Sequence, residues 1–372
     1  MRRVVIGLVL GALVAGPASA EAADPGRWLL TGWSSVPNDY WQGIAADRDG
    51  RVFFSGLFQG LWRTTHSLRR TAGVPAAIPA TVASTEGYNH IGDIAWQPQE
   101  GGRVVLPFEC YVPGSGPGTG NTCGTGSFGV ADPETLGLRY YVKLDPAEIP
   151  KAMWVASSPN ARLLWTSSGS DLLAYRSADV TTAHAAPGAT PIRAVRRLTG
   201  GVPPSGVTGG AFVGRRLLLA GQDGTTFQVW SIDTRSGARR LEIELPGVNG
   251  ESEGLDRVEL LGGELQWLIA PPVPNPTFGP TVAVLHLAAA LGRPRLGVAV
   301  RPRTRSGATI VRVRVTLRGA PVAGSRVRFA GARARTNHRG RASLRTRVAG
   351  SYRVLARKGR LRGLSGPVAV GG

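Results

Sequence analysis

The sequence predicts an all-β protein built from two parts of different composition. Short apolar runs recur along residues 28–290, and Gly, Pro, Asn and Asp turns separate them. No stretch has the sustained helical spacing of apolar residues that would indicate a long helix. All nine Trp lie between Trp28 and Trp267, whereas the last 80 residues contain no Trp. We therefore expect an aromatic-rich β-body followed by a second, different β-module.

The net charge of +20 divides the chain at the same place. Residues 293–372 hold 20 Arg and Lys358, with no Asp or Glu, whereas residues 1–292 carry 23 basic and 24 acidic residues. A general preference for Arg explains why the chain has only three Lys, but it does not explain 80 residues without an acid. The basic charge therefore belongs to the C-terminal module.

The first twenty residues predict a secretory signal peptide. A basic start, Met1–Arg3, precedes the apolar run Val4–Val14 and the small-residue pattern Ala18–Ala20. The alternative, a membrane anchor, needs about 20 apolar residues and this run is shorter. We expect cleavage near Ala20 and a monomeric, extracellular protein that is not transmembrane, with the cell wall as one candidate location.

The two cysteines, Cys110 and Cys123, bracket a segment rich in Gly, Pro, Ser and Thr. Exported proteins meet oxidising conditions, so we expect a disulfide that closes this loop. A metal-binding pair is the alternative, but no further Cys or His stands at ligand spacing nearby.

The apolar runs of the body group into similar units of about four short strands, with a period of about fifty residues. Such a period is typical of a β-propeller, in which a ring of sheets hides the sheet edges. The units cover residues 42–64, 91–144, 152–175, 210–245 and 254–287.

Five blades are the expected number. The last unit lacks a clear fourth strand, which Trp28–Trp33 can supply to close the ring. A sixth blade is the alternative if residues 66–86 or 176–205 contain a degenerate one.

The segment Phe227–Arg239 resembles the hairpin between the third and fourth strands of many propeller families. Residues 28–290 as a whole resemble exported bacterial propellers of the broad gluconolactonase-like and strictosidine-synthase-like kind. The resemblance implies the fold and no specific reaction, because no family's motif set is complete here.

Residues 293–372 predict a small β-sandwich. Thr309–Arg318 alternates Arg with Val and Leu, as expected of a strand with one buried face. The segments Gly319–Val327, Thr336–Ala342 and Gly350–Ala356 resemble bacterial Ig-like and carboxypeptidase-regulatory-like modules, which imply an accessory or adhesive unit. Disorder is the alternative, because the charge density is high.

An Arg-rich face outside the cell suits an acidic envelope polymer or polysaccharide. Arg pairs bidentately with phosphate and carboxylate, so we expect salt-dependent binding without nucleic-acid sequence specificity. A merely solubilising surface is the alternative. The candidate polyanion-binding residues are Arg312, Arg314, Arg326, Arg328, Arg345 and Arg347.

Polar residues open the inner strands of the predicted blades, on the face where the loops between second and third strands also emerge. A glycan or other small-molecule ligand is expected there, since long loops on a rigid ring commonly build sites. The candidate channel residues are Gln42, His90, Asp93, Glu109, Lys151, Asp223, Glu251 and Glu253.

Glu253 and Asp93 are candidate ligands for Ca²⁺, the cation that carboxylate oxygens favour. The lactonase-like resemblance implies a channel Ca²⁺ that polarises a substrate carbonyl, although the matching Asn and Asp ligands are not identifiable. A hydrated, salt-bridged channel without metal is the alternative. His66, His184, His286 and His338 stand apart and are expected to be surface or packed residues.

The sequence thus predicts an exported propeller that binds a ligand in its channel and is held to a polyanionic surface by a basic module. A Ca²⁺-dependent hydrolase or lactonase and a protein-interaction scaffold are the alternatives. No catalytic residue is assigned.

Overall fold

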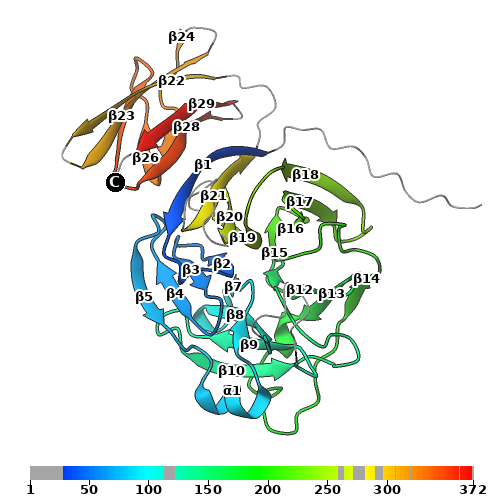
Figure 1. Cartoon of the computed structure of the whole chain (residues 1–372). Coiled ribbons are helices and arrows are strands. Elements are labelled where there is room, and N and C mark those ends of the chain that lie inside the picture. The colour runs from blue at the N-terminus through cyan, green and yellow to red at the C-terminus, as the bar shows by residue number, and fades with distance from the viewer. Residues whose placement is uncertain are drawn as a thin grey trace, which may run out of the picture.

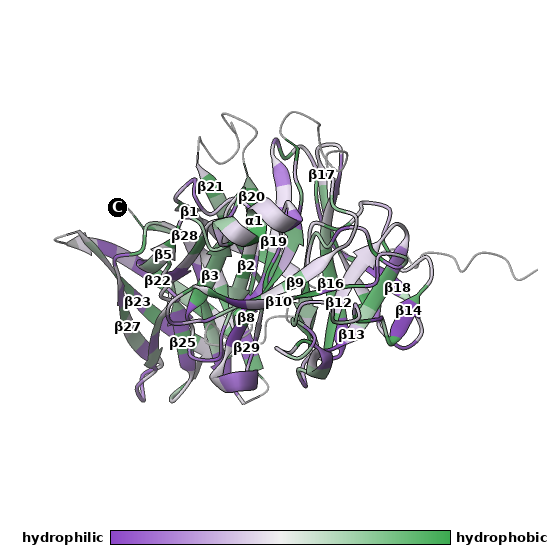
Figure 2. Cartoon of the chain, turned by 90° about the horizontal axis from the view of Figure 1, so that it is seen from below, coloured by the Kyte–Doolittle hydropathy of each residue, from purple (hydrophilic) through white to green (hydrophobic). Residues whose placement is uncertain are grey.

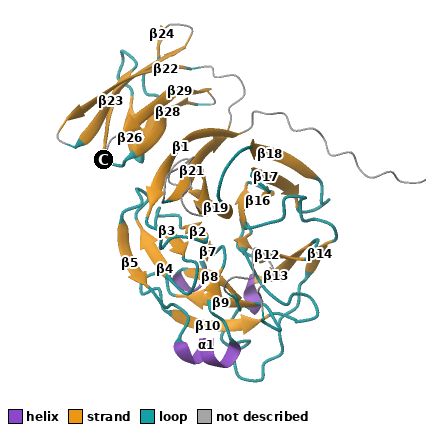
Figure 3. Cartoon of the chain, viewed as in Figure 1, coloured by secondary structure: helices purple, strands orange, loops and turns teal. Residues whose placement is uncertain are grey.

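The computed structural model describes residues 28–112, 122–258, 264–270, 281–289, 296–305, 307–317, 320–359 and 361–370. The predicted signal peptide lies outside these residues. Strands make up most of the described chain, and one short α-helix, α1 (Ala80–Glu86), and the 3-10 turns η1 (Gln99–Gly101) and η2 (Ser177–Asp179) lie between them (Figure 3).

Five small antiparallel sheets lie around a common centre in residues 28–289 (Figure 1). The first sheet has the strands β2 (Gly43–Ala46), β3 (Val52–Ser55), β4 (Leu61–Thr64) and β5 (Arg70–Val74). The second has β6 (His90–Ile91), β7 (Ala95–Gln97), β8 (Arg103–Glu109), β9 (Ser127–Ala131) and β10 (Leu138–Lys143).

The third sheet has β11 (Ala156–Ser157), β12 (Leu163–Ser168), β13 (Asp171–Arg176) and β14 (Arg196–Leu198). The fourth has β15 (Gly209–Val213), β16 (Arg216–Asp223), β17 (Thr226–Asp233) and β18 (Arg239–Leu245). The fifth has β19 (Glu251–Val258), β20 (Glu264–Ala270), β21 (Val282–Ala289) and, from the other end of the body, β1 (Trp28–Val36).

The innermost strands contact one another in a closed cycle. Strand β2 contacts β7, β7 contacts β11, β11 contacts β15, β15 contacts β19, and β19 returns to β2. The fifth sheet joins the two ends of the body, because β1 pairs antiparallel with β21 from Trp28 opposite Ala289 to Val36 opposite Val282. The arrangement is propeller-like, with the first strand of each sheet at the centre.

The two segments in which a sixth blade was considered contribute edge strands instead. Residues 66–86 supply β5 and helix α1, and residues 176–205 supply η2 and β14. Strand β5 pairs with β4, and β14 pairs with β13, so both are the outer strands of sheets whose inner strands were predicted. Neither segment forms a separate sheet in the described part of the chain.

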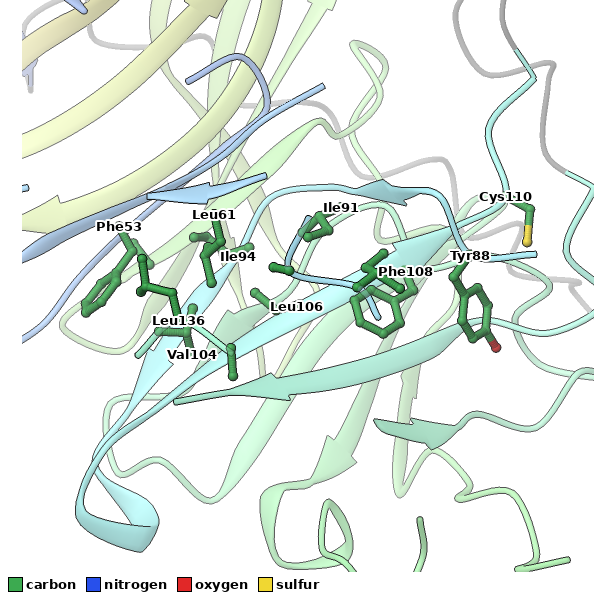
Figure 4. Packing of buried hydrophobic residues seen from close by; sticks show 14 residues of the cluster. Phe53, Leu61, Tyr88, Ile91, Ile94, Val104, Leu106, Phe108, Cys110 and Leu136 are labelled. Atoms are coloured by element: carbon green, nitrogen blue, oxygen red, sulfur yellow. The ribbon is translucent and has the colours of Figure 1, made fainter. Parts of the chain in front are cut away.

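Apolar side chains fill the spaces between neighbouring sheets. Between the first and second sheets, Phe53 and Leu61 meet Val104, Leu106 and Phe108 (Figure 4). Each is fully buried, and burial of one such side chain contributes roughly 1.5–3 kcal/mol. Similar clusters occupy the other spaces between sheets. The alternating apolar residues of each strand therefore hold the ring together.

The basic C-terminal part forms two small antiparallel sheets. One contains β22 (Gly297–Arg305), β23 (Ala308–Leu317), β24 (Ala320–Pro321) and β27 (Arg341–Thr346). The other contains β25 (Arg326–Phe329), β26 (Ala332–Arg335), β28 (Gly350–Lys358) and β29 (Leu361–Val370).

Alternating residues of these sheets build one shared core. Val311, Val313 and Val315 of the first sheet join Val327 and Phe329 of the second in a buried cluster. Figure 2 shows hydrophilic residues interspersed with apolar ones along the strands of this module. Because every second residue points inward, the Arg residues between these Val and Phe positions point away from the core.

The module packs against β1 of the body through β28 (Figure 1). Gly32 allows this approach, because a Cβ atom there would lie 1.2 Å from the backbone oxygen of Ser351. The hydroxyl groups of Ser34 and Tyr352 then lie 2.6 Å apart across the contact.

Candidate functional site

Asp93 lies at the centre of the ring and contacts all five sheets. Its carboxylate accepts backbone N–H groups from Ile44 of the first sheet at 3.0 Å, Gly210 of the fourth at 3.0 Å and Leu255 of the fifth at 3.4 Å. Its own backbone, between β6 and β7 of the second sheet, bonds to Met153 and Val155 beside the third. Asp93 is thus a structural link between inner strands.

Glycines at the openings of the inner strands make room for Asp93. A Cβ at Gly254 would lie 2.5 Å from one carboxylate oxygen of Asp93, and a Cβ at Gly209 would lie 2.8 Å from the other. Gly43 leaves similarly little space beside the Asp93 backbone. These positions need Gly because the backbones of three sheets converge on one side chain.

Two of the predicted channel residues pair directly above this link. The side-chain amide of Gln42, at the start of β2, donates to a carboxylate oxygen of Glu253 in β19 at 3.1 Å. Glu253 is 7% exposed, and Glu251 of the same strand is partly exposed.

Burial raises the pKa of Glu253 well above its ordinary value, and the nearby carboxylates of Glu251, Asp93 and Glu109 raise it further. The hydrogen bond from Gln42 opposes that rise. The carboxyl group therefore favours its protonated form, which can donate a hydrogen bond as well as accept one.

Three further predicted residues meet at the end of β8. His90 pairs with Glu109 across β6 and β8, and its Nδ1 lies 3.4 Å from Oε1 of Glu109. Lys151 places its Nζ 3.9 Å from Oε2 of the same carboxylate. We call Gln42, His90, Glu109, Lys151, Glu251 and Glu253 the mouth cluster.

His90 has unsatisfied hydrogen-bonding capacity. Both of its ring nitrogens are buried and have no hydrogen-bond partner among the described residues. A buried polar group without a partner is costly, by about 1–3 kcal/mol, unless a water or ligand supplies one. The imidazole is therefore ready to bond a molecule that enters the mouth cluster.

Aromatic rings border His90 at the same end of the ring. The Tyr111 ring lies 5.4 Å from the imidazole, centre to centre, and 6.5 Å from the ring of Phe58. Phe58 stands in the loop between β3 and β4 and is 53% exposed, which is unusual for so large an apolar side chain. Neither ring is among the site residues predicted from the sequence, although Phe58 stands in a loop of the predicted face and Tyr111 follows Cys110.

The disulfide predicted beside this cluster is confirmed. Cys110 and Cys123 are bonded, with their Cα atoms 5.1 Å apart. Because Cys110 follows Glu109 directly, the bond fixes the chain at the edge of the mouth cluster. Residues 113–121 of the enclosed loop lie outside the described residues.

Two of the predicted channel residues have other positions. Asp223 is exposed at the β16–β17 turn, and it is its neighbour Gln222 that reaches the fifth sheet by accepting from the backbone N–H of Ser252 at 2.6 Å. Asp93 is 1% exposed, and its two oxygens already accept backbone N–H groups.

The proposed pair of metal ligands lacks a suitable geometry. Asp93 uses its oxygens for backbone bonds, so it does not present them with Glu253 to a cation. Within the described ranges, no group of three or more His, Cys, Asp or Glu side chains is placed to hold a metal ion. Neither the cavity between the fifth sheet and the C-terminal module nor the one beside the third and fourth sheets is lined by a residue of the mouth cluster.

The six candidate Arg residues of the module divide between its two sheets. Arg312 and Arg314 are on β23, with Arg345 on β27 and Arg347 just after it, and all four are exposed. Arg326 and Arg328 are on β25 of the other sheet. Since both sheets turn their apolar residues to one core, the two Arg sets belong to opposite faces of the module.

No helix in the described part of the chain is long and apolar enough to cross a membrane.

Three solved structures resemble this chain at low similarity. An aldose sugar dehydrogenase from Streptomyces coelicolor, in its PQQ-bound form, is 14% identical over 73% of this chain and 99% of its own, with a TM-score of 0.37. A luciferin-regenerating enzyme is 12% identical over 74% of this chain and 96% of its own, with a TM-score of 0.43. An exo-beta-1,3-galactanase from Phanerochaete chrysosporium, with bound beta-1,3-galactotriose, is 10% identical over 92% and 93%, with a TM-score of 0.44.

No protein-family model and no curated protein sequence matches the chain. Likeness at these TM-scores assigns neither a family nor an activity. The propeller-like arrangement rests instead on the closed cycle of inner strands described above.

Proposed function

We propose that the chain is an exported five-bladed β-propeller that binds a carbohydrate at the mouth cluster, and that its Ig-like module attaches it to a polyanionic surface. One observation carries the first part. Gln42, His90, Glu109 and Glu253 come from distant parts of the sequence and meet at one end of the ring, beside accessible aromatic rings.

The chemistry of the mouth cluster suits a polyhydroxylated ligand. Sugar hydroxyls both donate and accept hydrogen bonds, so they match carboxylates, an amide and an imidazole placed side by side. His90 brings two ring nitrogens without partners in the described part of the chain. The rings of Phe58 and Tyr111 offer apolar faces on which the C–H groups of a sugar ring can pack.

The acid-rich character of the mouth cluster also sets a preference among glycans. Glu109, Glu251 and Glu253 gather there, and Lys151 is the basic residue that contacts Glu109. We therefore expect neutral or amino sugars to bind better than uronic acids, because a ligand carboxylate would be repelled.

The module supports the second part of the proposal. The sheet that contains β23 and β27 presents exposed guanidinium groups without a carboxylate in the same module, whereas Arg326 and Arg328 of the other sheet line the cavity beside the body. Such a surface binds phosphate- or carboxylate-bearing polymers through charge, with little demand for a particular sequence or linkage.

Screening the full chain on an array of neutral, amino and acidic glycans tests the site. We expect binding that weakens at least tenfold in His90→Ala and Phe58→Ala, with unchanged binding in Asp223→Asn, an exposed acid away from the cluster. No binding to any glycan, or binding that ignores both mouth variants, would contradict the proposal.

Ca²⁺-dependent hydrolysis is the alternative, and it would have to use Glu253 and its neighbouring carboxylates without Asp93, whose oxygens accept backbone N–H groups. Elemental analysis of the purified protein separates the two. Stoichiometric metal, together with a thermal midpoint that falls in chelator, would favour the hydrolase over the binding protein.

A further inference from the structure

A cavity of about 160 Å³ lies between the fifth sheet of the body and the second sheet of the module. By the same measure one water needs roughly 10–15 Å³, so a small organic group fits. Its walls come from both parts of the chain. The polar side chains that line it include Ser34, Glu264 and His286 of the body and Arg328, Arg333 and Tyr352 of the module.

Three of these residues form a chain of hydrogen bonds. The Ser34 hydroxyl lies 2.9 Å from Nε2 of His286, and Nδ1 of His286 lies 2.6 Å from a carboxylate oxygen of Glu264. Ser34 belongs to β1, His286 to β21 and Glu264 to β20, which are three adjacent strands of one sheet. The sheet itself therefore holds them in order.

The hydrogen bonds determine where the protons lie. A carboxylate at Glu264 accepts from Nδ1 of His286, and the same ring turns Nε2 toward the hydroxyl of Ser34. Nε2 then accepts the hydroxyl proton of Ser34. Tyr352 of the module lies beside this arrangement, with its hydroxyl 2.6 Å from that of Ser34 and donating to the backbone oxygen of Ala349 at 3.0 Å.

This arrangement of a hydroxyl, an imidazole and a carboxylate is the one that activates a serine nucleophile. Ser34 and His286 are almost fully buried, at 2% and 4% exposed, yet both border the cavity. An acyl group in the cavity would therefore meet the hydroxyl away from bulk water.

The module side of the cavity is strongly cationic. Arg326 lies opposite Arg357, and Arg328 lies opposite Arg333, in adjacent strands. Like charges directly opposite one another are destabilising, and an anion between them relieves the repulsion. Burial lowers the pKa of Arg328, and the neighbouring Arg333, Arg326 and Arg357 lower it further.

We propose that this cavity is a second site, which hydrolyses small esters that bear an anionic group. Ser34 is the nucleophile, His286 is the general base and acid, and Glu264 orients His286. The arginines of the module bind the anionic group. The site is independent of the mouth cluster.

The reaction balances with water as the only co-reactant. The Ser34 oxygen bonds to the ester carbonyl carbon as its proton passes to Nε2 of His286, and the carbonyl oxygen takes the negative charge of the tetrahedral intermediate. The ester C–O bond breaks and the alcohol leaves with the proton from Nε2. Water then attacks the acyl-serine, His286 again carries the proton, and the acid leaves as Ser34 regains its hydrogen.

Labelling with a fluorophosphonate probe, followed by mass spectrometry of the full chain, tests the nucleophile. We expect one adduct, on Ser34, that is absent from Ser34→Ala and at least tenfold slower in Glu264→Gln. Ser67→Ala is the matched control, because Ser67 lines the same cavity but bonds to Thr65. In this variant the adduct on Ser34 should form at the wild-type rate.

Hydrolysis of two 4-nitrophenyl esters of equal chain length tests the anion site. The succinate monoester should be cleaved with a kcat/KM at least tenfold above that of the butyrate ester, and Arg333→Ala should reduce that preference at least threefold. The mouth variant Phe58→Ala should affect neither, which separates this site from the proposed glycan site.

Two results would contradict a hydrolytic site at Ser34. If the folded wild type takes no label at Ser34 and cleaves neither ester, then Ser34, His286, Glu264 and Tyr352 serve only to dock the module, and the proposal is wrong. Labelling that persists in Glu264→Gln at the wild-type rate, with its thermal midpoint unchanged, would also overturn it.

Discussion

The carboxylate of Asp93 accepts the backbone N–H of Gly210 at 3.0 Å, although the two residues belong to different sheets and are 117 positions apart in the sequence. The same carboxylate accepts from Ile44 and Leu255. One side chain thus satisfies backbone donors from three inner strands, at the point where the five sheets come closest.

Replacing Asp93 by Asn should therefore destabilise the whole body. The amide NH₂ of Asn would face backbone N–H groups, so at least one buried donor would lose its acceptor, which costs about 1–3 kcal/mol. We expect a loss of about 1–3 kcal/mol in the free energy of unfolding, measured by urea denaturation. Asp223→Asn, at an exposed turn, should stay within about 0.5 kcal/mol of the wild type. Equal stability of the two variants would show that Asp93 does not link the sheets.

This central link shows what the sequence could predict and what it could not. The position of Asp93 at the opening of an inner strand was predicted, because its spacing to the next strand matches that of Gln42, Lys151 and Glu253. Its role was not, because which backbone groups converge on it depends on the closure of the ring. Gly209 and Gly254, which leave room for the Asp93 side chain, are the residues in the sequence that could have indicated this role.

The edge strands show a second limit of prediction. The segments Arg70–Val74 and Arg196–Leu198 are short, mostly polar and largely exposed, so they lack the apolar alternation that identifies a strand. They are strands because β4 and β13 offer them unpaired backbone groups. Likewise, Ser34 is far in the sequence from Glu264 and His286, and it joins them because β1 pairs with β21, which in turn pairs with β20.

Replacing Glu253 by Gln should change how stability depends on pH. Because Glu253 has a raised pKa when folded, the native protein holds this proton at pH values where the unfolded chain has lost it. Wild-type stability should therefore fall, relative to the variant, as pH rises above the ordinary value of 4.5, and the two should agree below it.

Thermal unfolding of both proteins between pH 4 and pH 9 measures this difference. Glu244→Gln is the control, because Glu244 is exposed and its carboxylate accepts from Gln228 on the outer strands. A stability difference between Glu253→Gln and the wild type that is the same at every pH would contradict the assigned protonation.

Replacing Gly32 by Ala should release the module from the body. Any Cβ at position 32 would collide with the backbone of Ser351, which a small side-chain movement cannot relieve. We expect a larger radius of gyration by small-angle X-ray scattering, with the circular dichroism of both parts retained. Gly366→Ala, where a Cβ would meet no atom within 4 Å, should leave the dimensions unchanged. A compact Gly32→Ala protein would mean that the contact between β1 and β28 is not what holds the module.

Charge reversal on the module should weaken binding to acidic polymers. Arg312 and Arg314 are exposed on β23, so the double variant Arg312→Glu, Arg314→Glu removes two contacts with a polyanion and adds repulsion. We expect at least tenfold weaker binding of the full chain to heparin at low salt, and weaker binding of the wild type as salt rises. Heparin affinity that does not respond to salt would exclude an electrostatic surface.

The central claim is that the mouth cluster binds a sugar. Its most direct test is calorimetric titration of the full chain with the best glycan from the array, in the wild type, in His90→Ala and in Asp223→Asn. We predict one glycan-binding site per chain. Its affinity should fall at least tenfold in His90→Ala and stay unchanged in Asp223→Asn. Equal affinity in all three proteins would place the glycan elsewhere and contradict it.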